Sequence, residues 1–346
     1  MEFLPFHEVK DHKEIVIIDS YFKGKAMLSH WRGAPVPKGM EDDSSTGIVL
    51  NAVKANHPSI KLPFVSNNHF DIDGFLGIWA LMNPVLAIKY EAILREAALI
   101  GDFREWKADD PISKEALKLC CWINSVEREK FYEPFAEKDE ATSCIPKYAY
   151  FLPKLADFFK DPASFNTEWR EEFFQVQEHQ HLLKNRGKIE RIDDLHIQLV
   201  SCPEPIHYYV LFQDSSKMDM VISLYDDNRY EVEYKYVSWV DTANRSLYPR
   251  LSFEALAHRL NELEESSYTW EFDRIMDTGP MLRLNKKGLN KAERFDHPFN
   301  RKIYSSSIRP NQFLSVVKSF YREKLTGISP RKSWTWKEMR EAVNES

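Results

Sequence analysis

Two short apolar runs, each ending in a polar residue, constrain the fold of this chain more than any other feature. Ile15-Val16-Ile17-Ile18 is followed by Asp19, and Leu62–Val65 is followed by Ser66. Runs of this length and β-branched composition are typical of buried strands. Polar loops and helical stretches follow both of them, so we predict an α/β fold.

The rest of the first half is predicted to be helical. Oxygen atoms of residues 42–46 can cap a helix over about 47–55, and Pro58 ends it. Ser113 can cap a later helix. The other predicted helices cover about 75–82, 85–100, 113–131, 147–160 and 168–184.

The pattern changes near residue 185. Strands are predicted over 197–200, 207–212, 220–225 and 230–236, with a polar turn at Asp226-Asp227-Asn228. Helices are predicted over about 253–265, 313–325 and 337–343. We therefore predict an α/β domain over 1–185 and, over 186–346, a strand-rich, mixed α+β domain with a basic helical tail.

Composition narrows the class of protein. The chain has 346 residues, 43% of them hydrophobic, which excludes disorder. No apolar run reaches the roughly 18 residues of a membrane span, and no leader pattern begins the chain. Its four cysteines include no C-x-x-C pair, which indicates reduced thiols. We expect a cytoplasmic protein without membrane contact.

Charge is distributed unevenly along the chain. The formal net charge is −6, yet residues 283–340 hold 15 Lys and Arg against 4 Asp and Glu, so this segment carries +11 and the remainder −17. We expect the segment to pack on the acidic remainder and to offer basic side chains to an anionic ligand; the alternative is a nucleic-acid arm. Packing is favoured by interspersed aromatic residues, which are Phe295, Phe299, Tyr304, Phe313, Phe320 and Tyr321.

The motif His69-x-Asp71-x-Asp73-Gly74 is the strongest chemical signal in the sequence. Because alternate residues at a strand end share a side, an imidazole and two carboxylates can converge there on Mn²⁺ or Mg²⁺. Gly74 would permit a tight turn, and the amides of the next helix would favour a bound phosphate. The alternative is a plain helix entry, in which Asp71 or Asp73 caps the helix.

This motif resembles the first motif of the DHH phosphoesterases. The resemblance implies a two-domain α/β enzyme that uses paired Mn²⁺ ions to hydrolyse phosphodiester or phosphoanhydride bonds. It implies that His69 and Asp71 hold one ion, Asp73 holds the second, and Asp71 and Asp73 are catalytic. Asp102 would be the bridging aspartate.

Two further residues are candidates for substrate binding. His297, in Asp296-His297, would correspond to part of the DHH triplet, although position 298 is Pro where that family has a second His. Arg32, in the loop Ser29–Gly33 after the first strand, could clamp a phosphate with two hydrogen bonds. The chain is also similar to an uncharacterised bacterial family that shares the H-F-D-x-D-G and G-D-F elements and has no established activity.

The sequence lacks the motifs of several other catalytic classes. The sequence contains no G-x-S-x-G, G-x-G-x-x-G or P-loop pattern, which argues against serine hydrolases, Rossmann dehydrogenases and P-loop enzymes. The expected function is metal-dependent hydrolysis of a small phosphorylated substrate. The competing functions are non-catalytic binding of a phosphorylated ligand or nucleic acid through the basic segment, and a degenerate relative that has lost its metals.

Overall fold

The computed structural model describes residues 1–131, 139–237, 239–290, 293–294 and 296–344, with side chains described up to residue 342. Phe295 lies outside the described residues. The chain divides into two compact units: residues 1–174 with 240–244, and residues 175–239 with 245–346. The first division falls inside helix α9 (Asn166–Arg186).

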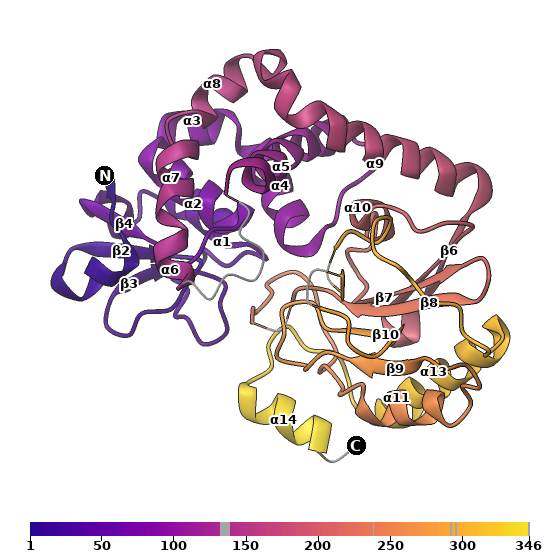
Figure 1. Ribbon diagram of the computed structural model, residues 1–346. Coiled ribbons are helices and arrows are strands. Elements are labelled where there is room, and N and C mark those ends of the chain that lie inside the picture. The colour runs from indigo at the N-terminus through magenta and orange to yellow at the C-terminus, as the bar shows by residue number, and fades with distance from the viewer. Residues whose placement is uncertain (132–138, 238, 291–292, 295, 345–346) are drawn as a thin grey trace. The chain divides into compact units, whose positions relative to one another are not determined.

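The first unit is built around a parallel sheet of four short strands (Figure 1). The strand order is β1-β4-β2-β3, and every neighbouring pair is parallel. Consequently the carboxyl ends of all four strands lie at one edge of the sheet. The strands are β1 (Glu2–Phe3), β2 (Ile15–Ile18), β3 (Ala26–Leu28) and β4 (Phe64–Ser66).

Helix α2 (Ile72–Met82) is the central helix of this unit. Ten of its eleven residues are buried, which suits a helix that is apolar on nearly every side. It packs against β2, α1 (Ser45–Lys54) and α4 (Glu91–Phe103). The other helices are α3 (Pro84–Lys89), α5 (Pro111–Lys130), α6 (Glu140–Ser143), α7 (Ile145–Phe151) and α8 (Leu155–Lys160), besides the 3₁₀ turns Phe6–Asp11, Pro58–Lys61 and Pro162–Phe165.

The second unit contains a mixed six-stranded sheet of order β5-β6-β7-β8-β10-β9. Only β6 and β7 are parallel to each other; the other neighbouring pairs are antiparallel. The strands are β5 (Lys188–Ile192), β6 (Ile197–Cys202), β7 (Met220–Tyr225), β8 (Arg229–Tyr234), β9 (Thr269–Phe272) and β10 (Met281–Asn285). Together with the parallel sheet of the first unit, it confirms the predicted α/β class.

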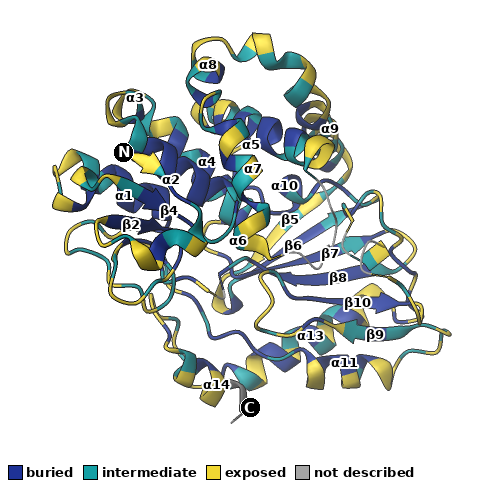
Figure 2. Cartoon of the chain, turned by 60° about the vertical axis from the view of Figure 1, so that its left-hand side comes forward, coloured by how far each residue is buried: buried dark blue, intermediate teal, exposed yellow. Residues whose placement is uncertain are grey.

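One face of this sheet is covered by α11 (Glu254–Asn261) and α13 (Pro310–Lys324), as Figures 1 and 2 show. Phe313 of α13 is fully buried and stacks on Tyr230 of β8, with ring centroids 4.4 Å apart. Helix α13 and the last three residues of β10 belong to the segment 283–340, so its predicted packing is confirmed within this unit. A last helix, α14, covers Trp336–Asn344.

Two predictions for the second unit have opposite outcomes. The polar turn joins β7 to β8 as predicted, and Asp227 and Asn228 both have positive φ, as a tight hairpin requires. The strand predicted over 207–212 is wrong, because α10 (Tyr208–Leu211) lies there and β6 pairs directly with β7. His207 caps that helix by accepting a hydrogen bond from the Tyr209 amide. A short buried apolar run is compatible with a helix as well as with a strand, so periodicity alone does not distinguish the two.

Candidate metal centre

Three loops bring ionisable side chains to the carboxyl edge of the first sheet. Asp19 follows β2, His30 lies two residues beyond β3, and the motif from His69 to Asp73 follows β4. Ligand sites of parallel α/β sheets form at this edge, because the loops there converge. The sheet therefore joins the motif to two residues that were not predicted as ligands.

His69 contacts two carboxylates. Its Nε2 atom lies 3.0 Å from Asp71 Oδ2 and 3.2 Å from Asp19 Oδ2. The other ring nitrogen, Nδ1, lies 2.8 Å from the Asn68 side-chain oxygen. Since an amide oxygen only accepts, Nδ1 carries a proton and Nε2 is the atom directed at the carboxylates. The predicted pair His69 and Asp71 is thus brought together, with Asp19 added.

His30 occupies the second half of the cluster. Its Nε2 atom lies 3.2 Å from Asp19 Oδ1, 3.3 Å from Asp102 Oδ2 and 3.6 Å from Asp73 Oδ2. Its Nδ1 atom donates to the Asp43 carbonyl oxygen at 2.7 Å, which fixes the ring and directs Nε2 inward. Asp102 reaches this group from the last turn of α4. Its bridging role stays a prediction, and Asp19 is the carboxylate that contacts both imidazoles.

The amino terminus of α1 holds the Asp73 carboxylate. The Ser45 and Thr46 amides donate to its two oxygens at 2.7 and 2.8 Å, and the Thr46 hydroxyl donates to the Asp73 carbonyl oxygen at 2.7 Å. Each carboxylate oxygen retains a second lone pair that can face a cation. Asp73 therefore caps a helix distant in sequence and still points at His30.

Asp71 caps its own helix. Its Oδ1 atom accepts from the Gly74 amide at 2.8 Å, which is the helix-entry interpretation of the motif, while Oδ2 remains on His69. The Gly74 amide is therefore already engaged at the helix terminus where a phosphate was predicted. Gly74 lies inside α2 and is not among the described residues with positive φ, so the predicted tight turn is not the reason for a glycine there.

Asp19 is the most constrained member of the cluster. Its Oδ1 atom accepts from the Ser45 hydroxyl at 2.7 Å, and the same hydroxyl oxygen accepts from the His30 amide at 3.1 Å. Its backbone is left-handed, with φ +47°, a conformation that is uncommon for residues other than glycine. Such strain persists where surrounding contacts fix it, which often happens at functional sites.

Burial and charge oppose each other in setting the pKa values. Burial alone would lower the pKa of His30, but the hydrogen bond and charge of Asp19 raise it to about 9. Burial would also lower the pKa of His69, but the Asp71 charge and Asp19 raise it well above its usual range. Burial, then the charge of Asp19, raises the pKa of Asp73 to about 7. Asp19 would be raised by burial, but both histidines lower its pKa far below normal.

The cluster reaches solvent on one side. The Asp19, His30 and Asp73 side chains are at most 2% exposed, whereas that of Asp71 is 39% exposed. His69 lies between them at 14%, and the Trp31 ring lies 5.6 Å from its ring. A ligand would therefore approach from the Asp71 side.

These residues fit a divalent cation. Asp19, His69 and Asp71 each offer a ligand atom within 4.8 Å of the others, and so do Asp19, His30 and Asp73. Carboxylates with imidazoles are the ligands that Mn²⁺ accepts, and carboxylates suit Mg²⁺. In each histidine the second ring nitrogen is held by an oxygen, as in metal-binding histidines generally. The two triads share Asp19.

The two residues predicted to bind substrate have other partners in the described structure. Arg32 donates to Asp241 Oδ1 at 3.0 Å and to the Val240 carbonyl at 2.9 Å, so its guanidinium secures the segment 240–244 within the first unit. His297 belongs to the second unit, where its ring stacks on Tyr208 at 4.8 Å. A role in substrate binding for either residue stays a prediction.

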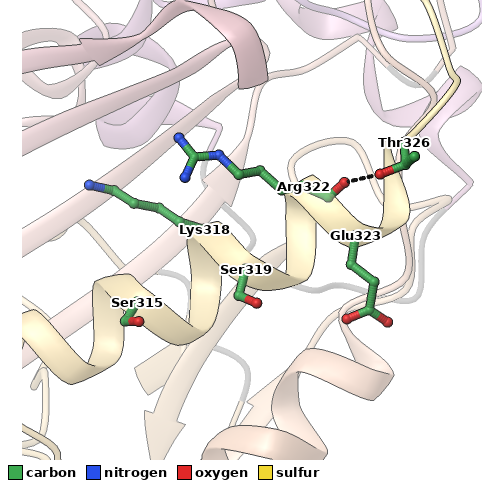
Figure 3. Close-up of a pocket in the computed structure, with 6 residues that line it drawn as sticks. All are labelled: Ser315, Lys318, Ser319, Arg322, Glu323 and Thr326. Atoms are coloured by element: carbon green, nitrogen blue, oxygen red, sulfur yellow. Dashed lines mark hydrogen bonds between the residues drawn. The ribbon is translucent and has the colours of Figure 1, made fainter.

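The basic segment forms a depression along α13, shown in Figure 3. Lys318 and Arg322 point the same way from the helix, while Glu323 points away from them and pairs with Arg259 at 2.9 Å. Arg322 Nε lies 3.6 Å from the Asp194 carboxylate. Arg322 thus has an acidic neighbour within its own unit. The residues that line the depression include no buried, convergent set of ligands. The other lining residues are Ser315, Ser319 and Thr326.

Among the described residues, no helix combines the length and apolar character needed to cross a membrane.

Comparisons with known proteins place the chain in a family without assigning an activity. No curated protein and no solved structure matches the sequence, and the DHH phosphoesterases give no family match. One family profile matches residues 1–332. The chain therefore belongs to DUF6687, a family of unknown function.

Proposed function

We propose that the first unit is a divalent-metal centre that hydrolyses a phosphodiester or phosphoanhydride bond in a small substrate. The observation that carries this proposal is the convergence of two histidines and four aspartates at the carboxyl edge of one parallel sheet. Asp19 contacts both histidines, and each histidine contacts at least one further carboxylate. Structural ion pairs rarely gather four carboxylates in a buried site, because their mutual repulsion is costly without cations.

The ligand set supports two ions. Asp19 Oδ2 faces His69 together with Asp71, and Asp19 Oδ1 faces His30 together with Asp73 and Asp102. We assign the first group to one cation and the second to another, with Asp19 shared. Mn²⁺ is the preferred cation, because imidazole nitrogen suits it better than Mg²⁺.

Different residues of the site have different roles in the proposed reaction. If these ligands held two ions, the site would gain hydroxide near neutral pH and neutralisation of the charge on the phosphoryl oxygens. The α1 amides and the Ser45 hydroxyl hold Asp73 and Asp19 in place, so these carboxylates need no reorganisation. Asp71 lies at the solvent side and is the ligand closest to an entering substrate.

Phosphate chemistry is favoured over other metal-dependent hydrolysis by the resemblance of His69-x-Asp71-x-Asp73-Gly74 to the DHH phosphoesterases. The competing function, non-catalytic binding through the basic segment, has weaker support. The Lys318 and Arg322 side chains lie on one helix, and Arg322 already has the Asp194 carboxylate as a neighbour.

A direct test combines metal analysis with a substrate panel. Untreated protein is assayed for bound metal, and then tested with Mn²⁺ and with Mg²⁺ on dinucleotides, cyclic dinucleotides, short polyphosphates and bis-aryl phosphates. We expect Asp19→Asn to abolish turnover, because it removes the shared ligand. Asp71→Asn and Asp73→Asn should each reduce turnover by at least about 100-fold, the usual scale for a lost metal ligand or its support.

Asp109→Asn is the matched control, since Asp109 is an exposed aspartate of the same unit outside the cluster. It should leave turnover unchanged. Metal-loaded protein that turns over none of the panel would favour the binding function instead. Turnover that survives all three cluster substitutions would show that the chemistry lies elsewhere in the chain.

A further inference from the structure

Asn67 carries a buried side-chain amide whose nitrogen makes no hydrogen bond of normal geometry, although it lies close enough to the Tyr148 hydroxyl oxygen for a weak interaction. It follows β4 directly and is 0% exposed. Its side-chain oxygen accepts from the Asn68 amide at 2.7 Å, and this fixes which end of the carboxamide is nitrogen. Its Nδ2 atom has no partner of normal geometry among the described residues. The neighbouring Tyr148 hydroxyl donates its own proton to the His69 carbonyl oxygen at 3.1 Å.

The environment of Gly74 shows where that nitrogen points. A Cβ atom built on Gly74 would lie 2.2 Å from Asn67 Nδ2, 3.0 Å from Asp71 Oδ1 and 3.2 Å from Asp19 Oδ2. One amide nitrogen and two carboxylate oxygens therefore surround a single point of α2. Any side chain at position 74 would collide with the amide. The glycine of the motif makes room for Asn67 beside the cluster.

Cation binding changes what these carboxylates need. His69 Nε2 contacts both Asp19 Oδ2 and Asp71 Oδ2, and a cation held by these three groups would replace those two contacts. An oxygen that binds an ion with one lone pair still requires a donor for the other. Asn67 Nδ2 has two hydrogens and lies near the same point of α2 as Asp19 Oδ2.

We propose that Asn67 is a positioning residue of the metal centre, whose side-chain amide donates to the Asp19 carboxylate and orients it toward the cations. This inference rests on the proposed function. It explains why a poorly hydrogen-bonded amide is retained where an apolar side chain of similar size would avoid the cost of burying it. Asn67 acts through Asp19.

The test compares Mn²⁺ binding and stability in Asn67→Leu and wild-type protein. Titration calorimetry gives the affinity, electron paramagnetic resonance of the bound Mn²⁺ reports the ligand field, and thermal unfolding without metal gives stability. We expect a 10- to 100-fold loss of affinity and an altered spectrum, the scale typical of lost outer-shell hydrogen bonds. The melting temperature without metal should be unchanged or higher, because an unpaired buried amide has been removed.

Asn285→Leu is the matched control. Asn285 is 3% exposed in β10 of the other unit and donates to Glu271 at 2.9 Å. It should leave the Mn²⁺ affinity unchanged. Equal affinity and spectrum in Asn67→Leu and wild type would overturn the role of Asn67 alone, as would an equal loss of affinity in Asn285→Leu. Absence of Mn²⁺ binding by wild-type protein would overturn the proposed function and this inference with it.

Discussion

Mn²⁺ binding to this protein should release protons, in a number set by the buried histidines. In the metal-free state His30 has a pKa of about 9, and the pKa of His69 is well above its usual value, so both imidazoles are protonated at pH 7. Metal ligation needs neutral imidazole. Each cation must therefore displace a proton from the histidine that faces Asp19.

The direction of these pKa shifts determines how Mn²⁺ affinity changes with pH. A histidine whose pKa is raised from about 6.5 to about 9 stabilises the metal-free fold fully below pH 6.5, and this stabilisation is lost as pH rises through 9. The proton and the cation compete for the same position, so Mn²⁺ affinity should increase with pH. If two protons are displaced, the affinity for Mn²⁺ should rise about 100-fold per pH unit, which corresponds to about 2.7 kcal/mol of binding free energy.

Asp73 adds a third proton at lower pH. Its pKa of about 7 means that the carboxyl group is mostly protonated below that pH and ionised above it. The release should consequently approach three protons near pH 6 and two near pH 8, with affinity still rising toward pH 9. Titration calorimetry in buffers of different ionisation enthalpy counts these protons directly.

Two histidine variants test whether the released protons come from the histidines of the metal centre. His30→Gln should release one proton fewer, because glutamine carries no displaceable proton. His258→Gln should release the same number as wild type, since the His258 side chain is 73% exposed in the other unit. A count near zero between pH 6 and 8, or an affinity that does not change with pH, would refute this account of the centre.

Two further predictions address Arg32 and the basic segment. Arg32→Ala should destabilise the first unit by about 2 kcal/mol, because it breaks a largely buried ion pair with Asp241; a raised KM with an unchanged melting temperature would instead support the phosphate clamp. Phe313→Ala should cost about 3–5 kcal/mol, because it leaves a cavity against Tyr230 in the core of the second unit. Chemical denaturation would measure this loss, and a negligible effect would contradict the anchoring of the basic segment.

The motif and its strand were accessible from sequence because both are local. His69, Asp71 and Asp73 lie within five residues, and the preceding apolar run indicates the strand that ends before them. Asp19 ends the other predicted strand in the same manner. The rule that strand ends converge at one edge of a parallel sheet is the signal that could have identified Asp19.

The sequence gives little indication that His30 is part of the site. It follows β3, whose three residues Ala26–Leu28 are too few for periodicity to reveal. Its role depends on three contacts with residues 11, 43 and 72 positions away, namely Asp19, Asp73 and Asp102. No spacing rule encodes such contacts, because they arise from the order in which the strands pair.

The sequence by itself determined the α/β class, the acidic motif after a strand, and the aromatic anchors of the basic segment, since each follows from local composition and period. Tertiary structure alone decided that Asp19 is shared by both histidines, that Asp73 caps a helix 28 residues earlier, and that Arg32 binds Asp241. Strand order β1-β4-β2-β3 brings these groups together. Pairing between distant strands depends on the packing of the whole unit, whereas a helix or a strand end depends on its neighbours in the chain.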